Sequence, residues 1–209
     1  MADLDNVISE SIYYANQVHG INLNSGTGST SGIPIYQEIK GGITSVSDYT
    51  GTVSGTVLVT TSANHGLTTG DVVVINTSLY YAGIYQITKV ADNTFYFTKS
   101  YTATQTGNFC KPSQLQILSG SGGLHTIHFH LSAYAASSGV NFRFSVYKNM
   151  TAQSVLKATE TFTTAGNYQN ISCTARINLT DGDVIWLSVE NLTDDSDITH
   201  TNGYFSTTN

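Results

Sequence analysis

Apolar and polar positions alternate along much of the second half of the chain. Ile127, Phe129 and Leu131 are separated by single histidines, as expected for a strand with one buried face. Residues 184–189 are almost continuously apolar, which is typical of a strand covered on both faces, and the two covers could be the core and a neighbouring subunit. These patterns predict strands over residues 124–133, 140–147, 158–162, 171–179, 183–190 and 203–206.

The middle of the chain contains shorter apolar runs separated by turn-forming residues. Glycine, asparagine and aspartate at 65–66, 69–71 and 92–93 mark the turns. The predicted strands are 56–61, 71–75, 83–90 and 94–98. Short strands at this spacing predict a small antiparallel barrel or sandwich over residues 41–111.

The first 40 residues show a different period. Leu4, Val7, Ile8 and Ile12 have helical spacing, and Asp3 or Asp5 could cap the helix that they would form. A Gly/Ser-rich stretch, residues 24–32, follows and has the composition of a flexible linker. Residues 1–40 are therefore predicted to be a helix on a tether, which would act as an attachment arm or fold back on its own domain.

Composition supports an all-β chain and excludes some partners. Only 11% of the 209 residues are charged, and Tyr alone contributes 13, which suits pleated surfaces and recognition more than helices. The net charge is −6 with 8 basic residues, so nucleic acid is not an expected partner. We also expect no membrane span and no secretory signal, because no long apolar run or signal-like start occurs. Cys110 and Cys173 could form a disulfide or remain as two buried free thiols.

Histidines provide the one candidate for metal chemistry. His128 and His130 are two apart on a predicted strand, so both point to the face opposite Phe129. If three copies of the chain met on an axis, these pairs could hold an axial metal ion; otherwise they line a polar face or a subunit interface without metal. The acidic run at 194–197 could hold Ca²⁺ or be a solvated loop.

No catalytic constellation is present. The sequence contains no Gly-x-Ser-x-Gly elbow, phosphate-binding loop or His-Glu-x-x-His pair. We therefore expect a protein that is not an enzyme and that has no cofactor beyond the possible axial metal.

The middle region, residues 41–111, resembles over about fifty residues a small β module that recurs in phage tail and other virion proteins. The shared elements, in order, are His65-Gly66-Leu67, Gly70-Asp71 before an apolar strand, Tyr81-Ala82-Gly83-Ile84-Tyr85, and Thr94-Phe95. The resemblance implies a structural module without catalytic residues.

Residues 112–209 resemble the trimeric jelly-roll heads of the tumour-necrosis-factor and complement-C1q type, in the versions found on phage fibres. The shared features are a glycine entry at 122–123, a strand ending in Tyr147-Lys148-Asn149, a turn at 165–168, and the Gly182-Asp183 entry into a strand containing Trp186. The resemblance implies a homotrimer; the polar closing strand at 203–207 departs from the pattern.

These expectations combine into one function. The chain is predicted to be a structural protein on the virion surface of a bacteriophage, such as a head fibre or decoration protein. Leu4, Val7, Ile8 and Ile12 would anchor it to capsid or tail proteins, and the trimeric head would be free to touch the host surface or its glycans. The alternatives are a monomeric carbohydrate-binding, lectin-like module that uses exposed aromatic residues, and a tail or neck fibre adaptor.

Overall fold

The computed structural model describes residues 2–5, 18–20, 35–36, 39–77, 80–194 and 196–208. In this part of the chain every regular element is a strand, and none of it is helical. The chain divides into two compact units: residues 39–111, named here the inserted unit, and residues 1–38 with 112–209, named the sandwich unit. The prediction of an all-β protein is therefore confirmed for the described residues.

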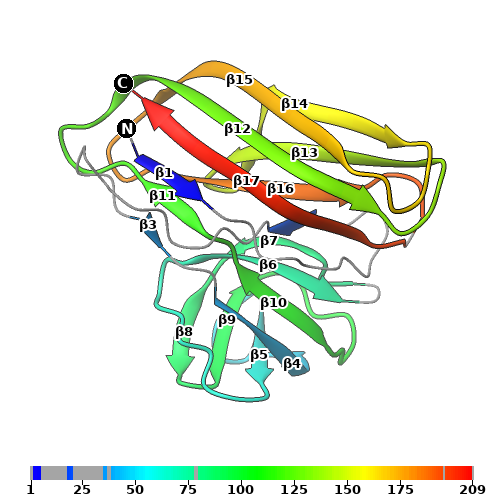
Figure 1. Cartoon of the computed structure of the whole chain (residues 1–209). Helices are drawn as coiled ribbons and strands as arrows, with labels where there is room; N and C mark the ends of the chain where they lie inside the picture. The colour runs from blue at the N-terminus through cyan, green and yellow to red at the C-terminus, as the bar shows by residue number, and fades with distance from the viewer. Residues whose placement is uncertain are drawn as a thin grey trace. The chain divides into compact units, whose positions relative to one another are not determined.

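Two antiparallel sheets form the sandwich unit (Figure 1). The four-stranded sheet has the order β1 (Ala2–Asp5), β17 (Ile198–Thr208), β12 (Gly123–Ala135) and β15 (Gln169–Leu179). The second sheet has the order β14 (Thr151–Phe162), β13 (Val140–Lys148), β16 (Val184–Asn191), β11 (Gln114–Gln116) and β3 (Ile35–Tyr36), and β2 (Val18–Gly20) also pairs with β16. From β11 onward, every connection except the β13–β14 hairpin crosses between the sheets, as in a jelly roll.

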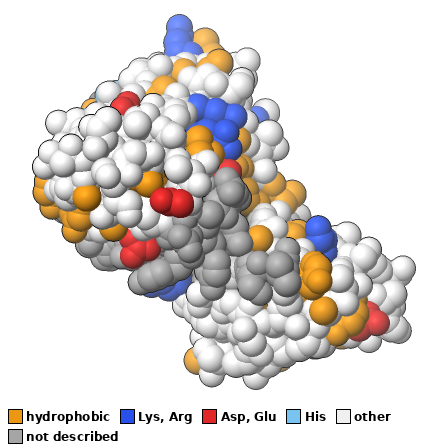
Figure 2. All heavy atoms as spheres, turned by 90° about the vertical axis from the view of Figure 1, so that its right-hand side faces the viewer, with side chains coloured by type: hydrophobic (Ala, Val, Ile, Leu, Met, Phe, Trp, Pro, Cys, Tyr) orange, Lys and Arg blue, Asp and Glu red, His pale blue; other side chains and the backbone are white. Residues whose placement is uncertain are grey.

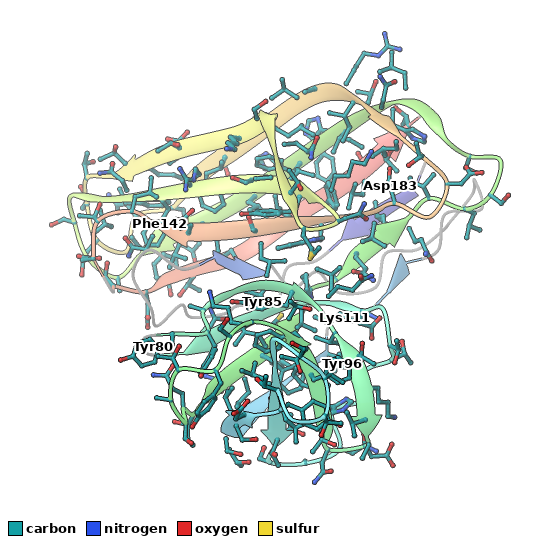
Figure 3. The ribbon with its side chains drawn as sticks, turned by 180° about the vertical axis from the view of Figure 1, so that it is seen from behind. Tyr80, Tyr85, Tyr96, Lys111, Phe142 and Asp183 are labelled. Carbon is teal, nitrogen blue, oxygen red and sulfur yellow. The ribbon has the colours of Figure 1, made fainter. Side chains whose placement is uncertain are left out.

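The core of the sandwich unit lies between the two sheets. Strand β12 alternates as its sequence predicts, and Ile127, Phe129 and Leu131 are fully buried. Strand β13 faces them with Phe142 and Phe144, and Figure 3 shows Phe142 between the sheets. One apolar face from each sheet thus fills a single core, which is the main favourable term for this unit.

Polar residues close the turn before β16. The Asp183 carboxylate accepts hydrogen bonds from the Thr180 amide at 2.7 Å and the Asn149 side chain at 2.9 Å, and lies 2.8 Å from the Lys148 ammonium. Burial opposes ionisation of Asp183, but these partners outweigh it and lower its pKa to about 2. The Gly-Asp strand entry noted in the sequence therefore ties together the ends of β13, β15 and β16.

Strand β16 is covered on both faces, as predicted. Ile185 and Leu187 point into the core, while Trp186 points away from it and is still fully buried. The Trp186 ring stacks on Tyr147 at 4.5 Å, and its indole nitrogen donates to the carbonyl of Asn149. This burial is complete within one chain, so it does not require a neighbouring subunit.

The N-terminal segment does not begin with the predicted helix. Ala2–Asp5 form strand β1, in which Leu4 lies opposite Phe205 of β17. Pairing with a partner strand outweighs a helical spacing of apolar residues, because an isolated short helix is marginal in water. The other predicted anchor residues, Val7, Ile8 and Ile12, lie outside the described residues.

A single curled seven-stranded sheet forms the inserted unit. Its order is β7 (Gly83–Gln86), β6 (Val72–Thr77), β10 (Gly107–Lys111), β4 (Ile39–Asp48), β5 (Thr56–Thr61), β9 (Thr94–Thr98) and β8 (Thr88–Ala91). Tyr85 of β7 stacks on Phe97 of β9 at 4.0 Å, which brings the first strand of this order against the last but one. The curled form agrees with the predicted small barrel.

His65 has a structural part in this unit. Its Nδ1 accepts a hydrogen bond from the Leu67 amide at 2.9 Å, so Nε2 carries the proton and donates to the Ala91 carbonyl at 3.0 Å. The buried ring also meets Phe95 edge-on at 5.4 Å. The His-Gly-Leu motif therefore fixes a turn, as expected from the sequence.

The inserted unit leaves and rejoins the sandwich unit between neighbouring antiparallel strands. Tyr36 of β3 pairs with Gln114 of β11, and Ile39 of β4 pairs with Lys111 of β10. Two residues connect the units on each side, 37–38 on the way in and 112–113 on the way out. The predicted boundary at residue 111 coincides with the end of this unit.

Gly41 offers a test of packing in the inserted unit. A Cβ atom at Gly41 would lie 2.7 Å from Phe109, which is directly opposite on β10. We expect Gly41→Ala to destabilise the protein by about 1–3 kcal/mol in chemical denaturation, because the buried Phe109 ring must shift. Gly51→Ala is the matched control, since nothing lies within 4 Å of its Cβ position. Equal stability of the two variants would contradict this packing.

His200 predicts how stability depends on pH. It is 1% exposed on β17, its Nδ1 has no hydrogen-bond partner in the described part of the chain, and burial lowers its pKa from 6.5 to about 4. The unfolded chain therefore binds a proton more readily, and stability should fall by about 3 kcal/mol as the pH drops from 6.5 to 4. The carboxylate of Asp183 stays ionised in this window, because its pKa is about 2.

Denaturation of His200→Leu between pH 7 and 4 measures this contribution. The free energy of unfolding of this variant should fall much less between pH 7 and 4 than that of the parent chain, because an apolar side chain takes up no proton. His130→Gln is the control, and its free energy of unfolding should fall as in the parent chain, because His130 is partly exposed. An unchanged decline in His200→Leu would show that other groups cause the acid sensitivity.

Candidate functional site

The candidate site lies on the outer face of the four-stranded sheet. Because Ile127, Phe129 and Leu131 of β12 point into the core, His128 and His130 point outward, as predicted. In the ladders beside β12, His128 lies opposite Thr174 of β15, and His130 lies opposite Tyr204 of β17. These four outward side chains are called the histidine face below.

His128 is held by hydroxyl groups on both sides. Its Nδ1 lies 2.9 Å from the Thr174 hydroxyl, and its Nε2 lies 2.8 Å from the Tyr204 hydroxyl. The rings of His128 and Tyr204 also stack, with centroids 4.8 Å apart and planes inclined by 12°. A neutral imidazole has one donor and one acceptor nitrogen, so each hydroxyl satisfies one of them. The ring is thus fixed in position while remaining partly exposed.

His130 is less constrained than His128. Its ring lies 6.0 Å from the Tyr204 ring, and no hydrogen bond to its nitrogens occurs within the described residues. Tyr204 therefore lies beside both imidazoles, and its phenol links them to the last strand of the sandwich.

On β12, β15 and β17 charge is sparse around the histidine face, whereas the register of β1 places Asp3 opposite Ser206 and Asp5 opposite Tyr204. Among the described side chains that β12, β15 and β17 direct outward, Arg176 is the one with a permanent charge. Leu124 and Tyr204 are exposed on the same face. Aromatic and imidazole groups with few charges are typical of the centre of a protein–protein interface. More widely, the surface in Figure 2 shows only small, scattered groups of charged side chains.

The histidine face offers two imidazoles to a metal ion within the described part of one chain. The described residues contain no group of three or more His, Cys, Asp or Glu side chains that could hold one. Within one chain, His128 and His130 supply two imidazoles, and His128 would have to exchange a hydroxyl partner for the metal. The axial metal thus stays a prediction that depends on a threefold assembly.

The structure also places the two cysteines, the acidic run and His125. Cys110 and Cys173 do not form a disulfide with each other; Cys110 lies in β10 and Cys173 in β15, and both are partly exposed rather than buried. In the acidic run, the Asp194 carboxylate accepts hydrogen bonds from Ser196 and Asn191 and so closes its own loop. His125 is buried and joins the Thr207 hydroxyl to the Ser121 carbonyl.

The described residues include no helix long and apolar enough to cross a membrane.

Sequence reasoning missed Thr174 and Tyr204 as partners of His128. Thr174 is 46 residues from His128 and Tyr204 is 76 residues away. Only the pairing register of β12 with both neighbours brings the three together, and no local pattern reports it.

Comparisons with known proteins leave the family open. No family model matches the chain, and no curated protein matches it. Among solved structures, it is similar to that of infectious bursal disease virus Gx strain, with 13% identity and a TM-score of 0.31 over 99% of this chain and 57% of that one.

Two other solved structures show likeness at the same level. The insecticidal delta-endotoxin Cry8Ea1 from Bacillus thuringiensis has 9% identity and a TM-score of 0.31, over 99% of this chain and 53% of the toxin. The cycloalternan-forming enzyme from Listeria monocytogenes has 12% identity and a TM-score of 0.28, over 92% and 25%. The chain thus spans little more than half of the first two proteins, and likeness of this degree carries no argument about function.

A double-mutant cycle tests the geometry of the histidine face. His128→Ala, Tyr204→Phe and the double variant should show a coupling free energy of about 1 kcal/mol in denaturation, because Tyr204→Phe removes the hydroxyl that shares a hydrogen bond with His128 and keeps the stacked ring. Tyr168→Phe with His128→Ala is the control pair, since Tyr168 pairs with Tyr134 instead. Additive effects of His128→Ala and Tyr204→Phe would contradict the contact.

Proposed function

We propose that the chain is a structural protein of a bacteriophage virion, a head fibre or decoration protein on the virion surface, whose sandwich unit forms a trimeric head. The observation that carries this proposal is the histidine face: an outward sheet surface on which the rings of His128 and Tyr204 stack and whose cross-strand neighbours Thr174 and Ser206 are uncharged. Covering the exposed parts of these rings gains free energy.

The architecture supports a trimeric head of the tumour-necrosis-factor and C1q type. The sandwich unit has the two-sheet, crossing connection of a jelly roll, and the motifs that resemble those heads lie at its turns. A ring of three copies needs contacts between two different surfaces of neighbouring copies, closed by a threefold rotation. With the histidine face turned towards the axis, three pairs of His128 and His130 would meet there, with or without a bound metal ion.

Attachment to capsid or tail proteins is proposed for the N-terminal segment around Val7, Ile8 and Ile12. The described strands on either side of it, β1 and β2, pair with β17 and β16. An attachment made between β1 and β2 would therefore be anchored in the head itself rather than carried on a separate arm. A tail or neck adaptor would use the same contacts at another place in the virion.

A monomeric carbohydrate-binding module is the second candidate. Exposed tyrosines favour it: Tyr80 projects from the inserted unit (Figure 3), and Tyr101 and Tyr168 are also exposed. Tyrosine combines an apolar ring with a polar hydroxyl, which suits sugar rings. The two candidates differ in oligomeric state and in association with virions.

Light scattering of the purified chain measures the oligomeric state. We expect a mass three times that of the 22.4-kDa chain, about 67 kDa. Thr174→Arg should shift the mass to that of the single chain, because it places a charge beside His128. Val155→Glu, at a residue 57% exposed on β14, is the control and should stay trimeric. A monomeric parent chain would remove the threefold axis and favour the carbohydrate-binding module.

Mass spectrometry of purified virions tests the location. Peptides of this chain should be present in intact particles and should remain after the particles are banded by density. Their absence from particles would rule out the virion assignment. Separation of heads from tails before the measurement would distinguish a head protein from a tail or neck adaptor.

A further inference from the structure

Three loops meet at one end of the sandwich unit. They are residues 136–139 after β12, 163–168 after β14, and 192–197 after β16, of which residue 195 is outside the described residues. Backbone hydrogen bonds tie them to one another: the Gly166 amide donates to the Ala135 carbonyl at 2.9 Å, and the Ala136 amide donates to the Asp197 carbonyl at 2.9 Å. These loops are called the loop end below, and their mutual bonds hold them in one arrangement.

A pair of tyrosines lies at the loop end. Tyr134, near the end of β12, and Tyr168, just before β15, meet edge to face with centroids 4.9 Å apart. Tyr168 is 58% exposed, the highest value among the large apolar and aromatic side chains of the described residues. Because the Tyr168 ring packs against Tyr134, it is presented to solvent in a fixed position at low entropic cost.

The polar groups around this pair are mostly uncharged. Loop 136–139 contains Ala, Ser, Ser and Gly, and loop 163–168 contains Thr, Thr, Ala, Gly, Asn and Tyr. Tyrosine with serine, glycine and asparagine is the composition of surfaces that recognise ligands through a rigid ring and adaptable hydrogen bonds. The third loop adds the carboxylates of Asp194 and Asp197 and no basic residue.

We propose that the loop end binds an uncharged pyranose sugar of a surface glycan, with the Tyr168 ring stacked against the sugar. The hydroxyl and amide groups of the two uncharged loops then exchange hydrogen bonds with the sugar hydroxyls. Anionic sugars are disfavoured because Asp194 and Asp197 repel them and no positive side chain in these loops compensates. This inference rests on the proposed function, since it names the residues with which an outward head would touch the host.

A glycan array probed with the full chain tests the ligand class. Uncharged hexose-containing glycans should bind, and sialylated or uronic-acid glycans should not. Selective binding of anionic glycans, or an array without any binding, would overturn the proposal. Calorimetry with the free methyl glycoside of the terminal sugar then measures the affinity of a single loop end. A monovalent sugar excludes the avidity that arises when several heads bind one glycan surface.

Two matched variants locate the site. Tyr168→Ala should weaken binding of the methyl glycoside about tenfold, because the stacking surface is lost. Tyr80→Ala removes a comparably exposed tyrosine from the inserted unit and should leave the affinity unchanged. Thermal unfolding of both variants verifies that they are folded, since both side chains are exposed. Equal affinities of Tyr168→Ala and the parent chain, or a loss confined to Tyr80→Ala, would place sugar binding elsewhere.

The outcomes separate this inference from the proposed function. A trimeric chain found in virions but without glycan binding would refute the loop-end site and leave the structural assignment standing. A monomeric chain absent from virions, whose glycan binding depends on Tyr168, would support the loop-end site and refute the virion assignment.

Discussion

The two-residue period of strand β12 is the constraint on which the sandwich unit depends. Burial of Ile127, Phe129 and Leu131 leaves His128 and His130 no position except the outer face. A shift of one residue in register would expose the aromatic core and bury two imidazoles, so the core and the histidine face specify each other. The same register brings Thr174 and Tyr204 beside His128 from two different strands. The packing of the core therefore also determines the composition of the histidine face.

Local patterns explain which parts of the fold could be predicted. The alternating strands β12 and β13 and the short strands β5 and β9 agree with their predicted ranges to within two residues. Strand β14 begins at Thr151, well before the predicted residue 158. The prediction missed its first residues because most of them are polar and exposed, so they show no apolar period. The single predicted strand at 83–90 is two strands, since Ile87 turns aside to bond with Gly70 and Asp71. The glycine-containing strands β4 and β10 had no strong apolar period and were missed.

The N-terminal residues show why spacing alone can mislead. Leu4 belongs to an apolar series with helical intervals, yet its backbone pairs with Phe205 near the other end of the chain. The periodicity of a short segment carries no information about a partner strand about 200 residues away. Sequence analysis found the histidine pair for the opposite reason: its alternation with apolar neighbours is local. It could not show that His128 is already occupied by two hydroxyl groups.

Pairing between β1 and β17 has a consequence for the order of folding during synthesis. All seven strands of the inserted unit lie between Ile39 and Lys111, so this unit can fold while the ribosome is still making the rest. The four-stranded sheet has to wait until Ile198–Thr208 emerge, because β17 separates β1 from β12. Until then one edge of β12 lacks its partner strand, and such an unpaired edge exposes the nascent sandwich to aggregation. An early-folding insertion shortens the stretch of unpaired chain during that interval.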